Sequence, residues 1–280
     1  MEIQYLGTAA AEGIPGIFCN CDTCVEARKR GGRNLRTRSQ ALIDGKLLID
    51  FPADTLAHCY SYGINLTEIK HCLLTHTHQD HLYCEDLAMR VPGFSDQGTE
   101  KPFTFYGLPG AMLKINSYIN SKVFEAKGIV EVVPMELFQP MQIGEFKVTP
   151  LKALHDFASH PAFYLIENAE GKRLLYAHDT NYFCDEAWEY FEKNPVRLDF
   201  VSLDCTEANV PKMGYVGHMN LKDNVRVKNR LTQLGCADDK TVFCSNHFSH
   251  NGVGVLFEEF SVEAQKEGFL TSYDGMKVMF

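Results

Sequence analysis

One short segment concentrates the side chains that could bind metal ions. Residues 73–81, LLTHTHQDH, place three imidazoles and a carboxylate within six residues, directly after an apolar run. In extended backbone, side chains two residues apart point the same way, so we expect His76 and His78 to reach one metal while Asp80 and His81 turn toward a second. Imidazole mixed with carboxylate suits Zn²⁺, Mn²⁺ or Fe, whereas Ca²⁺ and Mg²⁺ prefer oxygen ligands throughout. The segment therefore predicts a site for two metals.

A second group of potential ligands lies near the N-terminus. Cys19, Cys21 and Cys24 form a Cys-x-Cys-x-x-Cys arrangement in a Gly/Pro-bounded loop, residues 17–26. Three thiolates this close could hold a tetrahedral Zn²⁺ if a fourth ligand arrives, but spacing alone does not say which histidine or cysteine supplies it. The alternative interpretation is three unligated, redox-active cysteines.

Strands and helices must position these side chains. Besides an alternating stretch at residues 2–7, β-like runs occur at Gln40–Asp50, His71–Leu74, Phe103–Tyr106, Phe146–Leu151, Ala162–Glu167, Arg173–Ala177, Asp199–Leu203, Thr241–Cys244 and Met276–Phe280. Helix-like stretches fall near Ala53–Tyr62, Leu108–Ser121, Glu186–Lys193, Lys222–Leu234 and Val255–Glu267. This order predicts an α/β protein in which sheets pack together under outer helices, although a doubly wound sheet has the same periodicity. Most of the candidate histidines follow a predicted strand, where sites are usually located.

Bulk composition narrows the function classes. The 280 residues are 45% hydrophobic and 22% charged, and no repeat or linker divides them, so we expect one globular domain over residues 1–280. The absence of a signal peptide or an 18-residue apolar run predicts a cytoplasmic protein without a membrane partner, in which the ten cysteines are thiols or metal ligands. A net charge of −9 without a Lys/Arg block argues against long nucleic acids and favours a small-molecule substrate.

The histidine segment resembles the signature of the metallo-β-lactamase superfamily, and the rest of that pattern follows in order. The matching positions are Asp50 upstream of the segment and His155, Asp179 and His247 downstream of it. The resemblance implies an αββα sandwich with the site at one edge of the two sheets. It implies one metal on His76, His78 and His155, a second on Asp80, His81 and His247, and Asp179 as the bridge. His160 competes with His155 for its place, and we expect His178 to be structural.

The N-terminal cysteines extend the resemblance. Together with Gly7, Gly13 and Pro15, they resemble the branch that contains phosphoribosyl cyclic phosphodiesterases and the pyrroloquinoline quinone biosynthesis protein B. In the former, a histidine three residues after the last catalytic one completes a Cys₃His zinc site, and His250 stands at that position. One loop from His247 to His250 would then connect a structural zinc to the catalytic metals.

The resemblance also implies a reaction. A pair of divalent metals (Zn, Mn or Fe) lowers the pKa of bound water and stabilises charge on the substrate, which makes hydrolysis the expected reaction. Asp204 and the segment from Gly217 to Asn220 resemble the region where phosphodiesterases carry an extra histidine near the leaving group. We therefore predict His218, together with Asp80, as catalytic in a phosphodiesterase for small cyclic or nucleotide diesters, with a homodimer as a possible assembly. A structural histidine at the start of a helix is the alternative for His218.

Three other functions stay open. A tRNA 3′-processing nuclease should have Gly where Gln79 stands and should carry a basic arm, which this acidic chain lacks. An accessory protein of quinone biosynthesis shares the cysteine loop and the Gly-His-Met segment. A metal carrier or redox protein would use the same ligands without turnover.

Overall fold

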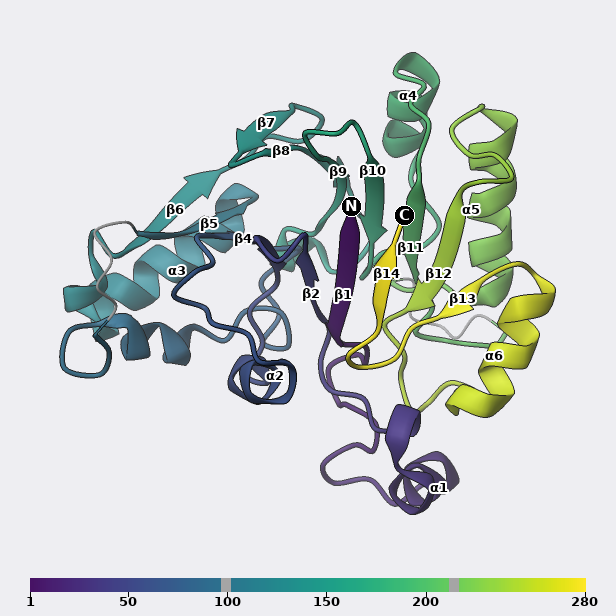
Figure 1. The fold of residues 1–280 in the computed structure, drawn as a ribbon, viewed down its shortest axis with the longest axis horizontal. Coiled ribbons are helices and arrows are strands. Elements are labelled where there is room, and N and C mark those ends of the chain that lie inside the picture. Colours follow the sequence, from purple (N-terminus) through teal and green to yellow (C-terminus); the bar gives the residue numbers. More distant parts are fainter. Residues whose placement is uncertain (97–101, 212–216) are drawn as a thin grey trace.

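The computed structural model describes residues 1–96, 102–211 and 217–280, which form two seven-stranded sheets packed face to face (Figure 1). The first sheet has the order β14 (Lys277–Met279), β1 (Glu2–Gly7), β2 (Gln40–Ile43), β3 (Leu47–Ile49), β4 (His71–Leu73), β5 (Phe103–Gly107) and β6 (Val130–Pro134). The second has the order β13 (Leu270–Thr271), β12 (Val242–Asn246), β11 (Phe200–Asp204), β10 (Arg173–Ala177), β9 (Ala162–Glu167), β8 (Phe146–Lys152) and β7 (Met141–Ile143).

Helices lie on the outer faces of both sheets, and one short N-terminal helix lies apart from them at the lower end of the view in Figure 1. Those in the described ranges are α1 (Asp22–Arg30), α2 (Thr55–Tyr62), α3 (Pro109–Lys122), α4 (Asp185–Lys193), α5 (Leu221–Gln233) and α6 (Phe257–Lys266), with 3₁₀ turns η1 (Gly32–Asn34), η2 (Cys84–Arg90), η3 (Phe124–Ala126) and η4 (Phe157–Ser159). In Figure 1, α2 and α3 lie on the side of the first sheet, and α4, α5 and α6 lie on the side of the second. No helix of the described residues is both long enough and apolar enough to cross a bilayer.

The alternation of side chains along β11 shows how the layers form. Phe200 belongs to the hydrophobic cluster between the two sheets, whereas Val201 and Leu203 belong to the outer cluster that contains Trp188 of α4 and Leu231 of α5. Successive side chains of a strand point to opposite faces, so a strand that is apolar throughout can bury both faces. A third cluster joins α3 to the outer face of the first sheet. The predicted αββα sandwich is therefore confirmed.

The direction of the strands brings six loops to one edge. Strands β3 and β4 are parallel, as are β10, β11 and β12, and β8 runs in the same direction as β10 because each is antiparallel to β9. The segments that follow these strands contain Asp50, the histidine segment, His155, Asp179 and His247. All the predicted catalytic metal ligands are thus carried by loops at the carboxyl ends of strands.

Several elements differ from the sequence predictions. The run Gln40–Asp50 is a hairpin of β2 and β3, which turns through Asp44 and Gly45 at positive φ. Strands β6, β7 and β13 and helix α1 were not predicted. Strands β7 and β13 are very short, and α1 buries only Cys24 and Ala27, so their patterns are weak. The supposed loop at 17–26 was wrong in its second half, since α1 begins at Asp22.

Candidate metal centre

Three imidazoles form the first group of potential ligands. His76 and His78 follow β4, and His155 follows β8. The Nδ1 atom of His78 lies 2.9 Å from Nε2 of His76 and 3.1 Å from Nε2 of His155. Three ring nitrogens that converge in this way can occupy one face of a tetrahedral metal.

The other nitrogen of each ring has its own partner, which fixes the orientation of the ring. These partners are Thr75 Oγ1 at 3.0 Å for His76, Asp156 Oδ2 at 3.2 Å for His78 and the Gly217 carbonyl oxygen at 3.2 Å for His155. Metal-binding histidines typically use their second nitrogen in this way, which holds the tautomer that ligates. The inward-facing nitrogens of the group are thus positioned before any metal arrives.

The second group combines carboxylates with imidazoles. Nε2 of His81 lies 3.1 Å from Oδ2 of Asp80 and 3.1 Å from Oδ2 of Asp179, and Nε2 of His247 lies 3.0 Å from the same Asp179 oxygen. The other Asp179 oxygen, Oδ1, lies 3.7 Å from Nε2 of His155 in the first group. The Asp179 carboxylate therefore stands between the two groups, as the family resemblance implied for a bridging residue.

The second group has the character expected of a cation site. Among the residues that the structure describes, the buried atoms His81 Nε2, Asp179 Oδ2 and His247 Nε2 make no hydrogen bond of acceptable geometry, although they lie close together. Buried polar atoms are nearly always paired, and leaving one unpaired costs about 1–3 kcal/mol. A divalent cation among these three atoms would remove that cost, so the residues fit a metal.

Backbone strain collects around the same centre. Asp50, Asp179 and His247 have φ values of 67°, 50° and 65°, in the left-handed region that residues other than glycine seldom adopt. Such conformations cost of order 1–3 kcal/mol each and persist where the surroundings enforce them, often at functional sites. Asp50 shows such enforcement, because its buried carboxylate accepts hydrogen bonds from the Thr75 backbone N–H at 2.8 Å and from His81 Nδ1 at 2.7 Å.

Asp204, the last residue of β11, organises the far side of the centre. Its carboxylate accepts hydrogen bonds from the backbone N–H groups of Asp179, Thr206 and Met219 at 3.0, 3.1 and 3.0 Å, and from His218 Nδ1 at 2.9 Å. A carboxylate engaged by three backbone donors is a positioning group rather than a free metal ligand. With Nδ1 bound to Asp204, the His218 ring can exchange a proton with a substrate only through Nε2.

The charge states follow from burial and neighbours. Burial opposes ionisation of Asp179, but the imidazoles of His247 and His81 outweigh it and lower the pKa of Asp179 well below its usual value. Burial and the charge of His81 lower the pKa of His76 far enough to keep that ring neutral. For His218, burial alone would lower the pKa, but the Asp204 carboxylate overcomes it and raises the pKa. His218 can therefore carry a proton near neutral pH.

Two further histidines stay outside both groups. His178 is buried behind the centre, where Nε2 lies 2.8 Å from Ser202 Oγ, and burial with the nearby His247 lowers its pKa to about 3. His160 is exposed, and its ring covers Gly110 so closely that a Cβ there would lie 1.9 Å from the ring. His155 and not His160 joins His76 and His78.

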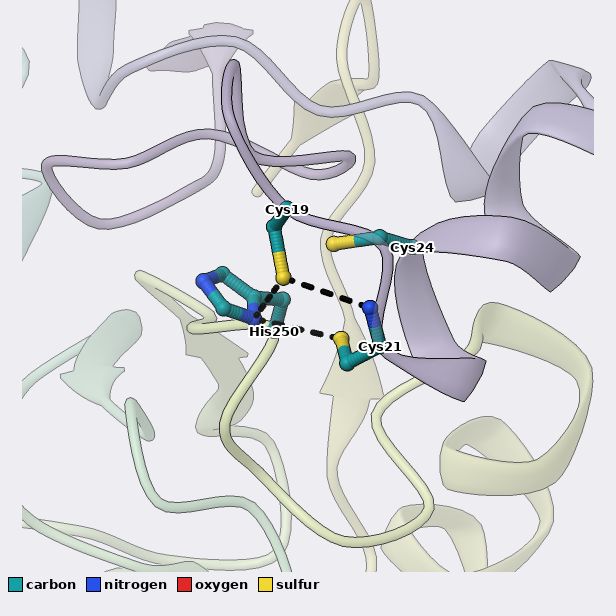
Figure 2. A group of neighbouring side chains, drawn as sticks. All are labelled: Cys19, Cys21, Cys24 and His250. Atoms are coloured by element: carbon teal, nitrogen blue, oxygen red, sulfur yellow. Dashed lines mark hydrogen bonds between the residues drawn. The ribbon is translucent and has the colours of Figure 1, made fainter.

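Figure 2 shows the three cysteines converging on the ring of His250. Nδ1 of His250 lies 3.5 Å from the sulfur of Cys21 and 3.7 Å from that of Cys19, and the four potential ligand atoms, including Cys24 Sγ, lie within 4.8 Å of one another. Burial would raise the pKa of Cys21, but the hydrogen bond from the Cys24 backbone N–H and those of the neighbouring side chains lower it to about 6. A thiol this acidic suits a metal ligand.

The N-terminal loop closes tightly around this cluster. The Gly16 N–H points at Cys24 Sγ, 3.3 Å away, and the Cys21 N–H at Cys19 Sγ, 3.4 Å away. A side chain at Gly16 would contact Cys19 and the His250 ring at 3.2–3.4 Å, so the loop has little room for any residue but glycine. The four residues fit a tetrahedral Zn²⁺.

The sequence left the support of the centre largely unassigned. Asp204 was noted in the sequence without a role, although it ends a buried strand, much as Asp50 and Asp179 follow theirs. Glu12 and Glu207 were not predicted either. They line a pocket of about 330 Å³ together with ligands of both groups and His218. No sequence pattern points to these two, because only the fold brings their loops to the centre.

Comparisons with known proteins agree with this geometry. A family model described as a β-lactamase superfamily domain matches residues 48–235, well over half of the chain. A curated relative, coenzyme PQQ synthesis protein B of Methylobacterium radiotolerans, is 29% identical over 159 residues, which cover 50% of this chain and 49% of that protein. The chain therefore matches about half the length of this relative.

Solved structures show the same fold over the whole chain. Zn²⁺-bound PqqB from Methylobacterium extorquens has a TM-score of 0.77 at 19% identity, with all of both chains covered. A diphosphatase from the PhnP family has a TM-score of 0.72 at 20% identity and covers 100% of this chain and 98% of its own. The short form of human tRNase Z has a TM-score of 0.65 at 16% identity, with coverage of 100% and 99%.

Proposed function

The chain belongs to the β-lactamase superfamily, and from that premise we propose that it is a metal-dependent hydrolase that cleaves a small phosphodiester. The observation that carries the proposal is His218, which lines the same pocket as ligands of both groups and is held from behind by the buried Asp204 carboxylate at 2.9 Å. A protein that only stores or carries metal has no use for an oriented acid beside it.

Two divalent cations, zinc or manganese, would occupy the two ligand groups. One would be held by His76, His78 and His155, the other by Asp80, His81 and His247, with Asp179 between them. When bound, they would supply a hydroxide nucleophile at neutral pH and stabilise negative charge on the phosphate. A third, structural zinc would be held by Cys19, Cys21, Cys24 and His250.

The protein's own groups would then control protons and orientation. The low pKa of Asp179 keeps its carboxylate ionised and ready to ligate. His218 would give its proton to the leaving oxygen as the bond between phosphorus and that oxygen breaks. Water supplies the new oxygen on phosphorus and releases a proton, which restores the acid, so one water is consumed for each alcohol released. Asp204 holds the ring in the tautomer that makes this transfer possible.

The size of the pocket also supports a small substrate. Its volume of about 330 Å³ suits a metabolite-sized ligand, and the lining residues that the structure describes include neither Lys nor Arg. Charge on a phosphodiester would therefore be neutralised mainly by the cations, as in other sites of this chemistry. Bulk charge points the same way, since the net charge of −9 disfavours a nucleic-acid polymer.

The likeness to coenzyme PQQ synthesis protein B supports a second candidate, a biosynthetic accessory protein without diester turnover. Both candidates require bound metal, so metal content does not separate them. Only the first requires an acid at His218.

The test compares His218→Asn with the wild type on two diesters that differ in leaving group. An alkyl diester needs a proton on its leaving oxygen, whereas bis(4-nitrophenyl) phosphate releases a stable anion. We expect turnover of the alkyl diester to fall by about 100-fold or more, turnover of the nitrophenyl diester to fall much less, and metal content to stay unchanged. Equal losses on both substrates would remove the acid role, and a metal-loaded wild type that hydrolyses neither would favour the accessory function.

A further inference from the structure

The metal centre lies where two pockets of different chemistry meet. One has a volume of about 330 Å³ and the other of about 460 Å³, and His78 and His155 line both. A phosphodiester carries two organic groups on one phosphorus, so a phosphate at the junction would direct one group into each pocket. We refer to the pockets as the acidic arm, which contains Glu12 and Glu207, and the aromatic arm, which contains Phe157.

The acidic arm presents hydrogen-bond acceptors away from the metal ligands. Glu12 accepts a short hydrogen bond from the Ser249 hydroxyl, and its Oε1 lies 3.7 Å from His250 Nε2, so two residues of the loop after β12 hold its carboxylate in place. Glu207 is buried in the same wall. Carboxylates repel phosphate and attract hydrogen-bond donors, because an ionised carboxyl group only accepts. This arm therefore suits a group that carries hydroxyls or an ammonium.

The aromatic arm presents the ring of Phe157 beside the metal ligands, and the carboxylate of Asp156, which also lines this arm, is engaged by His78 Nε2 and the Ala158 N–H. Phe157 is 72% exposed and shares its pocket with Leu154 and Asn181. The turn that carries it is fixed, since Asp156 accepts a hydrogen bond from the Ala158 N–H at 3.1 Å and the Ser159 carbonyl accepts one from the Thr77 N–H at 3.1 Å. A large apolar ring held in water is stabilised by stacking against a planar group, as bases stack on aromatic side chains.

We infer that the substrate is an unsymmetrical phosphodiester, with a planar aromatic group stacked on Phe157 and a hydroxyl- or ammonium-bearing group held by Glu12. The inference rests on the proposed phosphodiesterase function and adds the direction of cleavage. His218 lines the acidic arm, so the group that leaves is the one in that arm. The bond from phosphorus to the hydroxyl- or ammonium-bearing group breaks, water adds to phosphorus, and the products are an aryl phosphate monoester and an alcohol.

Four synthetic diesters test the two arms. They are phenyl 2,3-dihydroxypropyl phosphate, phenyl 2-aminoethyl phosphate, phenyl propyl phosphate and methyl 2,3-dihydroxypropyl phosphate, with products separated by chromatography. We expect phenyl phosphate and glycerol from the first diester, although phenol is chemically the better leaving group. Phenyl propyl phosphate lacks donors and the methyl diester lacks a ring, so each should have a kcat/KM about tenfold lower than the best substrate. The ranking of the dihydroxypropyl and aminoethyl diesters identifies the donor.

Two variants and two matched controls connect the effects to the residues. Glu12→Gln keeps an acceptor for Ser249 but loses the charge, and Phe157→Ala removes the ring. We expect Glu12→Gln to erase the preference for the dihydroxypropyl or aminoethyl group over propyl, and Phe157→Ala to erase the preference for phenyl over methyl. The controls are Glu189→Gln, on the exposed surface of α4, and Phe94→Ala, which removes a ring that is 69% exposed and lies outside both arms. Zinc content is measured for Glu12→Gln, because this residue approaches His250.

Release of phenol and glycerol phosphate, or preferences that neither variant changes, would overturn the inference. If no diester is hydrolysed, the proposed function fails, and the arms are then tested by calorimetry on the metal-loaded protein. Phenyl phosphate should bind about tenfold more weakly to Phe157→Ala, and glycerol phosphate about tenfold more weakly to Glu12→Gln. Equal affinities for the wild type and the variants would overturn the assignment of the planar group to Phe157 and of the hydroxyl-bearing group to Glu12.

Discussion

Replacing Asp50 by Asn should weaken metal binding at the second ligand group without unfolding the chain. Asp50 binds no metal in this account, but its Oδ2 accepts a hydrogen bond from His81 Nδ1 at 2.7 Å with both side chains fully buried. Asn tolerates the positive φ of 67° at this position, so the backbone can stay as it is. The Asn carbonyl oxygen can also keep the bond from the Thr75 N–H.

The conflict arises at His81. The Asn amide would place an N–H opposite the N–H of Nδ1, and the imidazole can relieve this only by moving its proton to Nε2, the nitrogen that faces Asp80 and Asp179. A protonated Nε2 cannot ligate. Losing such a support typically costs 10–100-fold in metal affinity, or about 1.4–2.7 kcal/mol. The first group should be affected less, because the partners of its three histidines are Thr75, Asp156 and the Gly217 carbonyl, and Asp50 reaches His76 through the Thr75 hydroxyl.

The assay is competition with a chromophoric chelator, together with metal analysis per chain. Asp44→Asn is the matched control, since Asp44 also has a positive φ, of 48°, and accepts a backbone hydrogen bond from Glu2 at 2.6 Å, away from the centre. We expect one weakened site in Asp50→Asn and wild-type affinities in the control. Wild-type affinity at every site of Asp50→Asn would refute the role given to this carboxylate.

Three other predictions concern the fold and the cysteine cluster. Gly7→Ala should lower the free energy of unfolding in urea by about 1–3 kcal/mol, because the new Cβ would lie 2.0 Å from the Arg38 carbonyl oxygen. An unchanged midpoint of the urea transition would mean that the backbone moves aside at no measurable cost. Cys21→Ser should lose one zinc per chain and melt at a lower temperature while the two catalytic metals remain, and an unchanged zinc content would exclude this residue as a ligand. Burial lowers the pKa of His58 to about 4, below the usual 6.5. As pH falls, the unfolded chain therefore binds a proton at this histidine before the folded chain does, and the free energy of unfolding decreases between pH 6.5 and 4. Between pH 7 and 5 the free energy of unfolding should fall by about 2 kcal/mol because of His58. In urea unfolding, His58→Gln should lack this part of the pH dependence. An equal pH dependence in both proteins would contradict the lowered pKa.

The layered fold was predictable because the signals for it are local. Long apolar or alternating runs mark β8 to β12, and the strongest helices have clear amphipathic patterns. The hairpin of β2 and β3 was read as one strand because the turn at Asp44 and Gly45 is short. Helix α1 escaped because its sequence is mostly polar, and its first turn contributes Cys24 to the cysteine cluster.

Part of the candidate site was predictable from the sequence and part was not. His76, His78, Asp80 and His81 are neighbours in sequence, and family resemblance located His155, Asp179 and His247 after later strands. The arms of the pocket are different, since Glu12 and Phe157 come from loops whose meeting depends on the whole sandwich. Phe157 lies two residues after the predicted ligand His155, in a loop expected to contact the substrate, but its partner pocket was not predictable. Glu12 has no predicted metal ligand beside it, so only the structure places it at the centre.

The central claim is that two metals beside His218 hydrolyse a phosphodiester. The most direct test is to strip the protein of metal with a chelator, restore Zn²⁺ or Mn²⁺ stepwise, and follow both metal content and the hydrolysis of an alkyl phosphodiester. The account predicts no turnover without metal and full turnover only when both ligand groups are filled, with none in His76→Ala. Full turnover by the metal-free protein, or no turnover of any diester by the fully loaded one, would contradict it.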